Sequence, residues 1–408
     1  MSRILRYGKQ HEITLDLDDQ NILADCREIR GIALEDPVAA TAAAVSEPLD
    51  FPSLADSTIP GDQIAIALDF DVPQADAIVA GIIQVLLEGH AEPEMITVVC
   101  APGYNSSGEA DWSPTQLVPE DIRDKVLVEH HNPADKANLA FLGPAQDHSP
   151  IYFNRRVCEA DVILPVSTKK LADTLGYVGV HGGLFPTFSD TETQTRFYSA
   201  KSVSDVEQSA QRRKESQQAA FQLGVQFTIQ VIPGPGNSVL HIVAGECETV
   251  AVEGERLCRA AWLHRVPAEA SLVVATIEGG PDQQTWENAA RALHAASVMV
   301  QQDGAIVLCT ELACPPGPAL QRLAVGDEDR MYDDIRGLET PDAIAASMLL
   351  VAREQARVYL LSKLDSETVE DLGVGFVSDP EDVSRLSERH ESCILLGNAH
   401  RAFGKIVS

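Results

Sequence analysis

The chain has 408 residues, of which 31 are basic and 61 acidic, so its formal net charge at pH 7 is −30. An electrostatic field of this sign repels nucleic acids and anionic membranes, and we therefore expect neither as a partner. With 45% hydrophobic residues, the composition is that of a globular protein long enough for two domains.

The cysteine pattern argues against a metal or redox site. None of the eight cysteines forms a CxxC pair, so we predict no metal site and expect buried free thiols in a reducing compartment. The first residues lack an apolar signal core, and no apolar run reaches the length of a membrane span. We therefore expect a cytoplasmic protein.

Apolar runs alternate with amphipathic segments along the first part of the chain. Alternation over residues 3–16 predicts a hairpin or an edge strand, and residues 33–60 indicate a small helix within a long connection. Further strands are predicted at 64–68, 96–100, 126–128, 162–166, 227–232 and 239–243, and helices at 74–89, 204–220 and 249–262.

A second series of strand and helix units follows. Its predicted strands are 272–276, 305–310, 358–362 and 393–396, and its predicted helices are 286–300, 340–356 and 380–389. This alternation predicts an α/β fold with largely parallel sheets covered by helices on both faces. We place the domain boundary near Val266-Pro267, which gives domains 1–265 and 266–408.

The stretch from Asp161 to Thr193 has the strongest features of a site. Its buried strand runs into Lys169 and Lys170 at the carboxyl end, the edge where open α/β sheets bind ligands. Four glycines follow within eight residues, at 176, 179, 182 and 183, with His181 between them. Such glycines either let the backbone approach a ligand closely or form turns with positive φ.

Other polar residues allow two interpretations each. Asp69 and Asp71 follow the strand 64–68 and could bind a ligand or cap the next helix. His131 could act as a base or simply lie in a loop. The two lysines could hold a phosphate or carboxylate or be solvated, and Glu287 and Arg291 could pair with each other one helical turn apart.

Several motifs together resemble the nickel-dependent lactate racemase family over nearly the whole chain. They are His131-Asn132-Pro133-Ala134-Asp135-Lys136-Ala137-Asn138-Leu139, Leu142-Gly143, Pro150-Ile151-Tyr152-Phe153-Asn154, Ala160-Asp161-Val162-Ile163, Gly176-Tyr177, Pro186, Ser189, Glu192-Thr193, Gly279-Gly280-Pro281-Asp282 and the helix from Trp286. The resemblance implies two α/β domains with the site in the cleft between them.

The resemblance also implies a chemistry. In that family a nickel-pincer nucleotide takes a hydride from the α-carbon of a 2-hydroxy acid and returns it to either face. Histidines act as acid and base, and a lysine tethers the cofactor. Matched on Gly176 and Gly179, the tethering lysine falls on Gly182, a loop histidine on Ala172 and the nickel-ligand histidine on Tyr198. We therefore expect no nickel-pincer cofactor.

Other motifs of the family are only partly kept. The first-domain catalytic histidine becomes Asn105, while the aspartate of the family's D-H-T-R-P motif is retained as Asp69. In the second domain, the glutamine becomes Glu287 and the lysine Ala290, one residue before Arg291.

Three hypotheses follow. The first is a divergent, lactate racemase-like protein without nickel-pincer activity that binds a small polar or anionic ligand in the interdomain cleft. The second is an isomerase, a racemase or epimerase of a 2-hydroxy acid or sugar acid with a rebuilt site, and the third is a scaffold without a ligand. We predict catalytic roles for His131, Lys170 and His181, and ligand contacts from Asp69, Asn105, Lys169, Tyr198, Glu287 and Arg291.

Overall fold

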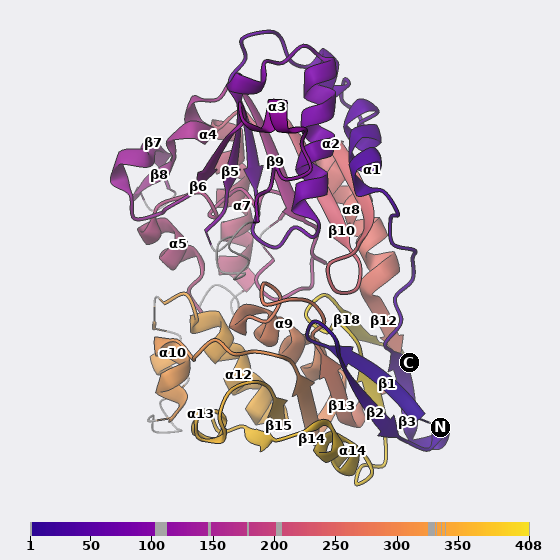
Figure 1. Ribbon diagram of the computed structural model, residues 1–408. Coiled ribbons are helices and arrows are strands. Elements are labelled where there is room, and N and C mark those ends of the chain that lie inside the picture. The colour runs from indigo at the N-terminus through magenta and orange to yellow at the C-terminus, as the bar shows by residue number, and fades with distance from the viewer. Residues whose placement is uncertain are drawn as a thin grey trace.

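Two six-stranded sheets, each with its own helices, form the framework of the computed structural model (Figure 1). The structure describes residues 2–102, 112–145, 148–177, 179–200, 206–324, 331, 333–335, 337–338 and 340–407. The strand orders are β11-β10-β9-β4-β5-β6 and β16-β15-β14-β13-β17-β3. The predicted α/β class with largely parallel sheets is confirmed.

The first sheet is parallel except for its β10–β11 hairpin. Its strands are β4 (Ile64–Leu68), β5 (Ile96–Cys100), β6 (Leu127–His130), β9 (Val162–Thr168), β10 (Phe227–Pro233) and β11 (Val239–Glu246). Its helices are α1 (Pro37–Ser46), α2 (Ala75–Glu88), α3 (Glu120–Arg123), α4 (Arg155–Glu159), α5 (Thr191–Phe197), α7 (Val206–Gln222) and α8 (Cys247–Trp262). The central strand β4 is buried along its whole length, as parallel strands between two helical layers require.

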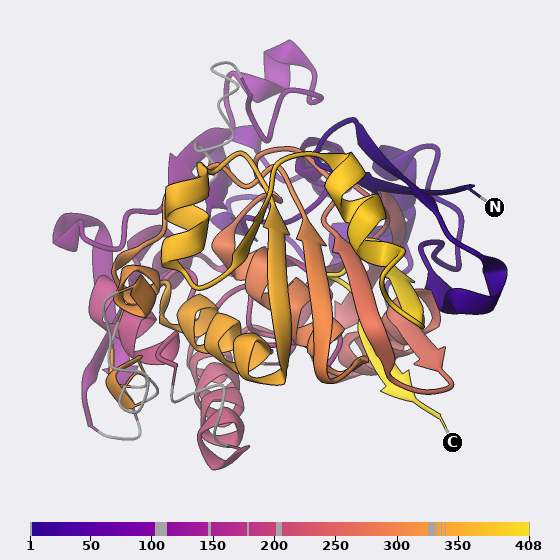
Figure 2. The ribbon, with the colours of Figure 1, turned by 90° about the horizontal axis from the view of Figure 1, so that it is seen from below.

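The second sheet is parallel throughout. Its strands are β3 (Ile22–Cys26), β13 (Ala270–Thr276), β14 (Val300–Cys309), β15 (Ala356–Leu361), β16 (Gly375–Val377) and β17 (Cys393–Leu396). Its helices are α9 (Trp286–Ser297), α10 (Pro318–Gln321), α12 (Ala343–Gln355), α13 (Ser366–Asp371) and α14 (Pro380–Ser387). Figure 2 shows this sheet from below, with helices on its two sides.

The N-terminal residues belong with the second sheet. The predicted hairpin forms as β1 (Ser2–Tyr7) and β2 (His11–Asp16), and its buried side chains pack with those of β13 and β14. Strand β3 then pairs with β17. A division at residue 265 therefore separates the two sheets only for the chain after Cys26, because the apolar face of the hairpin is covered by the second unit.

Loops and a shared core hold the two units together. One hydrophobic cluster contains Ile232 and Leu240 of the first unit and Val273 and Leu308 of the second. The fully buried Trp262 donates from Nε1 to Pro233 O at 2.9 Å. Small sheets are completed by β7 (Leu139–Pro144) with β8 (Pro150–Asn154) and by β12 (Leu263–Val266) with β18 (Phe403–Ile406). The shared cluster fixes the loops of the two units relative to one another.

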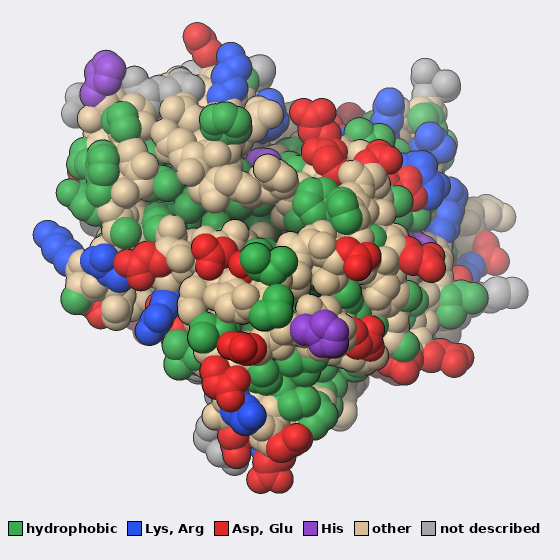
Figure 3. Space-filling view, turned by 90° about the horizontal axis from the view of Figure 1, so that it is seen from above, with side chains coloured by type: hydrophobic (Ala, Val, Ile, Leu, Met, Phe, Trp, Pro, Cys, Tyr) green, Lys and Arg blue, Asp and Glu red, His purple; other side chains and the backbone are tan. Residues whose placement is uncertain are grey.

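Acidic side chains are spread over the surface seen in Figure 3, among hydrophobic and uncharged polar ones. In the part of the chain that the structure describes, every helix is too short or too polar to cross a membrane.

Candidate ligand site between the two units

A small hollow, here called the inner pocket, lies where the carboxyl ends of β4 and β9 face helix α9. It has a volume of about 60 Å³, and its lining includes Asp69, Lys170, Gly182, Gly183, Tyr198, Glu287 and Arg291. Since one water molecule needs roughly 10–15 Å³ of such volume, the pocket holds several water molecules. Five predicted site residues, Asp69, Lys170, Tyr198, Glu287 and Arg291, therefore come together from both units.

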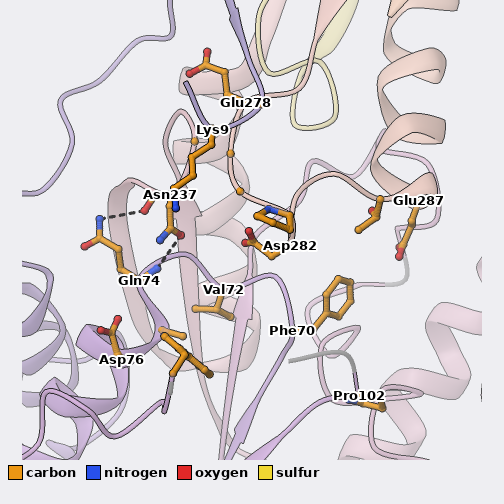
Figure 4. Close-up of a pocket in the computed structure, with 18 residues that line it drawn as sticks. Lys9, Phe70, Val72, Gln74, Asp76, Pro102, Asn237, Glu278, Asp282 and Glu287 are labelled. Carbon is orange, nitrogen blue, oxygen red and sulfur yellow. Dashed lines mark hydrogen bonds between the residues drawn. The ribbon is translucent and has the colours of Figure 1, made fainter. Parts of the chain in front are cut away.

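A larger hollow, the outer groove, has a volume of about 620 Å³. It is lined by the β1–β2 turn with Lys9, the loop after β4, the β10–β11 turn with Asn237, and the loop from Glu278 to Asp282 (Figure 4). Phe70 and Glu287 line both hollows, so the groove lies beside the pocket. Two hydrogen bonds from Gln74 to Asn237, at 3.2 and 3.1 Å, hold one wall together.

The glycine loop contains turns with positive φ, one of the two roles that its sequence allows. Gly176 and Gly179 have φ values of +75° and +101°, which residues with a side chain rarely adopt. Gly183 instead permits close packing, because a Cβ there would overlap Ser167 and lie 2.7 Å from Asp69 Oδ2. The loop can therefore lie directly against the strand ends.

The two lysines after β9 form ion pairs in opposite directions. Lys170 Nζ lies 2.9 Å from Asp71 Oδ2, at the edge of the inner pocket. Lys169 is fully buried, with Nζ 3.1 Å from Glu255 Oε2 on α8 and 3.4 Å from the hydroxyl of Tyr177. Lys169 does not line the inner pocket or the outer groove. In this structure Lys169 is therefore held in a buried ion pair, and its ligand contact stays a prediction.

The two aspartates after β4 occupy different electrostatic environments. Burial, and secondarily the charge of Asp71, raise the pKa of Asp69 to about 8. Burial also raises the pKa of Asp71, but the charges of Lys170 and Arg291 outweigh it and lower the value overall. Neither aspartate caps α2, because its N-cap is Gln74 and lacks a side-chain hydrogen bond. Asp69 is thus mostly protonated at neutral pH and can donate a hydrogen bond into the pocket.

Arg291 and Tyr198 supply further polar groups. The Arg291 guanidinium pairs with Glu287, one of the two interpretations that the sequence allowed, and donates to Asn288 Oδ1 at 2.9 Å. Arg291 is only 7% exposed, and its Nε has no hydrogen-bond partner within the described structure. Burial and the charges of Glu287 and Asp69 raise the pKa of Tyr198, so its phenol remains protonated at neutral pH.

The two predicted catalytic histidines lie elsewhere. His131 Nε2 donates to Ser189 O at 2.9 Å, the Asn154 amide lies 3.4 Å from Nδ1, and burial lowers the pKa of the ring. Burial likewise lowers the pKa of His181. Neither histidine lines the inner pocket or the outer groove, and the catalytic roles stay predictions. Asn105 lies outside the described residues.

Sequence reasoning missed several groups at the site. Gln230 is a buried polar residue inside the apolar strand β10 and lines the inner pocket, so its place in an apolar run could have identified it. Thr187 and Ser167 also line the pocket. Lys9 lines the groove from the N-terminal hairpin. The sequence predicted the hairpin but gave no sign that Lys9 lies at the site. The described residues contain no group of three or more His, Cys, Asp or Glu side chains that could hold a metal ion.

Comparisons with known proteins agree with this architecture. The family described as the lactate racemase N-terminal domain matches residues 7–210. The lactate racemase apoprotein from Thermoanaerobacterium thermosaccharolyticum has a similar structure, with a TM-score of 0.80 and 15% identity over 99% of this chain and 100% of that one. A protein from Thermotoga maritima is also similar in structure, with a TM-score of 0.64 and 12% identity over 92% of this chain and 100% of that one. No curated protein matches the sequence. At these identities the structural matches establish the fold.

The raised pKa of Asp69 makes a pH-dependent prediction about stability. Because the unfolded carboxyl titrates near pH 4, the folded state binds a proton between about pH 4 and pH 8 that the unfolded state lacks. The contribution of Asp69 to stability is therefore full below about pH 4 and is lost as the pH rises towards 8. As the pH rises from 5 to 8, we expect the free energy of unfolding of Asp69→Asn to increase by at least about 1 kcal/mol relative to that of the wild type.

Urea denaturation at a series of pH values measures this difference. Replacement of the exposed Asp16 by Asn serves as the control and should leave the pH profile unchanged. Parallel profiles for the wild type and Asp69→Asn would contradict the assigned environment of Asp69.

Proposed function

We propose that this chain, which belongs to the family of the lactate racemase N-terminal domain, is a divergent member of it and binds a small anionic or polar ligand. The ligand lies in the inner pocket between the two units, and the protein works without the nickel-pincer nucleotide. The observation that carries this proposal is the arrangement of donors in the pocket.

The donors come from both units and converge on one small space. Lys170 and Arg291 bring positive charge, while Tyr198 and the protonated Asp69 bring neutral hydroxyl donors. The unpartnered Nε–H of Arg291 is the donor that a carboxylate satisfies best, because guanidinium groups bind carboxylates with charge-assisted hydrogen bonds. A 2-hydroxy acid offers both a carboxylate and a hydroxyl to such a pocket.

The residues present do not fit the nickel-pincer nucleotide. By the family resemblance, the tether position is Gly182, which has no amine, and the ligand position is Tyr198, whose protonated phenol is a poor nickel ligand. Lys170, the lysine of the described pocket lining, is paired with Asp71. Neither hollow has a histidine or a cysteine among its described lining residues. We therefore derive no step through this cofactor.

Binding of small acids tests the proposal. We expect D-lactate, L-lactate or glycolate at millimolar concentration to raise the melting temperature of the wild type by mass action. Arg291→Met should weaken binding by about tenfold or more, because it removes a buried charged donor. Tyr198→Phe, which preserves the packing, should weaken it by a smaller factor.

The matched control is His181→Ala, which should bind as the wild type does because His181 does not line the pocket. Isothermal calorimetry on all four proteins gives the affinities. An absence of any response to the three acids, or equal binding by Arg291→Met, would overturn the proposal.

Nickel content tests the part of the proposal that concerns the cofactor. The protein should be expressed together with a nickel-pincer biosynthesis system, purified, and examined by intact-mass spectrometry and metal analysis. We expect an unmodified mass and no stoichiometric nickel, because the pocket lacks the tether and the ligand. A covalent adduct with one nickel per chain would show a working member of the family.

A racemase or epimerase with a rebuilt site is the second candidate, favoured by the pKa of Asp69. A buried carboxyl that titrates near pH 8 can take up and release a proton at physiological pH. This candidate predicts deuterium incorporation at the α-carbon of D- or L-lactate in heavy water, measured by NMR, and its loss in Asp69→Asn. If lactate takes up no deuterium at the α-carbon, the racemase or epimerase candidate is excluded. The groove is open and includes charged side chains in its lining, so it gives no support to the scaffold hypothesis.

A further inference from the structure

The outer groove differs from the inner pocket in the sign of its charge. Its lining contains the carboxylates of Asp76, Glu278, Asp282 and Glu287 but one cationic side chain among the described residues, that of Lys9. In Figure 4, Asp282 lies between Lys9 and Glu287 in the middle of the groove. The pocket is lined instead by Lys170 and Arg291.

Three of the groove carboxylates have neutral hydrogen-bond partners. Asp76 accepts from Gln116 at 2.6 Å, Glu278 from Asn398 at 2.7 Å, and Asp282 from Gln283 at 3.1 Å. Amide donors orient a carboxylate without balancing its charge. Glu287 is the exception, because it pairs with Arg291. Arg401 lies near Glu278 and Asp282, but the described lining of the groove still holds more carboxylates than cations.

The buried Arg291 connects these features to a ligand. Its side chain is more than nine-tenths buried, its Nε has no hydrogen-bond partner within the described structure, and the residue lines the inner pocket. Because Phe70 and Glu287 line both hollows, a ligand held at Arg291 extends past them into the groove. Its far end then meets Asp282 and Glu278.

We propose that the ligand is a zwitterion: a small 2-hydroxy acid whose carboxylate lies in the inner pocket and whose far end carries an amine or guanidine in the outer groove. This inference rests on the proposed function and adds the chemical class of the ligand. A cation in the groove gains the attraction of several carboxylates, whereas a second carboxylate there is repelled.

A series of acids of equal length tests the inference. The probes are 2-hydroxyhexanoate, 6-amino-2-hydroxyhexanoate and 2-hydroxyadipate, each measured by isothermal calorimetry with the full chain. We expect the amine to bind about tenfold more tightly than the neutral acid, and the dicarboxylate more weakly than either. The preference for the amine should shrink as salt is raised, because exposed charges are screened.

Two charge-matched variants locate the effect. Asp282→Asn removes one exposed groove carboxylate and should reduce the preference for the amine several-fold, with little effect on the neutral acid. Glu367→Gln removes the same charge from an exposed position on α13, outside the groove lining, and should leave the preference intact.

The possible failures differ from one another. If none of the three acids binds, the proposed function fails and this inference fails with it. If the acids bind but the amine shows no advantage, or if Asp282→Asn and Glu367→Gln behave alike, only the assignment of the groove to a cation is overturned.

Discussion

Two ion pairs at the end of β9 determine the form of the site. Just after the strand, Lys169 reaches Glu255 on α8, while Lys170 reaches Asp71 after β4. A fully buried ammonium is stable only with a close counter-charge and further hydrogen-bonding partners, which Glu255 and Tyr177 provide. The pairs therefore join the central strands to the helix layer and to the loop after β4, and loss of either partner would leave an unpaired buried charge.

The ion pair between Lys170 and Asp71 also helps to explain the raised pKa of Asp69. Lys170 is engaged by Asp71, so Asp69 has no ion pair with any residue that the structure describes and lies beside a second acidic group in a buried position. The proton that it retains turns an acceptor into a donor. The second unit completes the arrangement: Arg401 donates to Gly234 O and to Gln283 Oε1 at 3.2 Å, and thereby links the β10–β11 turn to the loop before α9, the helix that carries Arg291.

The sequence predicted local structure better than it predicted long-range contacts. Buried apolar runs identified β4, β5 and β17 with their observed bounds, because a parallel strand covered on both faces has few polar residues. The packing of the N-terminal hairpin on the second sheet depends on contacts across more than 250 residues, and no periodicity encodes them. The sequence named Arg291 and Tyr198 as ligand contacts, and the fold brings both into the lining of the inner pocket, whereas His181 lies outside that lining.

The charges at the site also bear on how a ligand can be held. Lys170 and Arg291 already have carboxylate partners, so an incoming anion adds to balanced ion pairs instead of meeting free cations. The attraction for a carboxylate is then modest, and it depends on the open Nε–H of Arg291 together with the hydroxyl donors of Tyr198 and Asp69. A ligand whose far end is also negative is repelled by the carboxylates of the groove. Selectivity therefore depends on the far end of the ligand, because the groove carboxylates attract a positive charge there and repel a negative one.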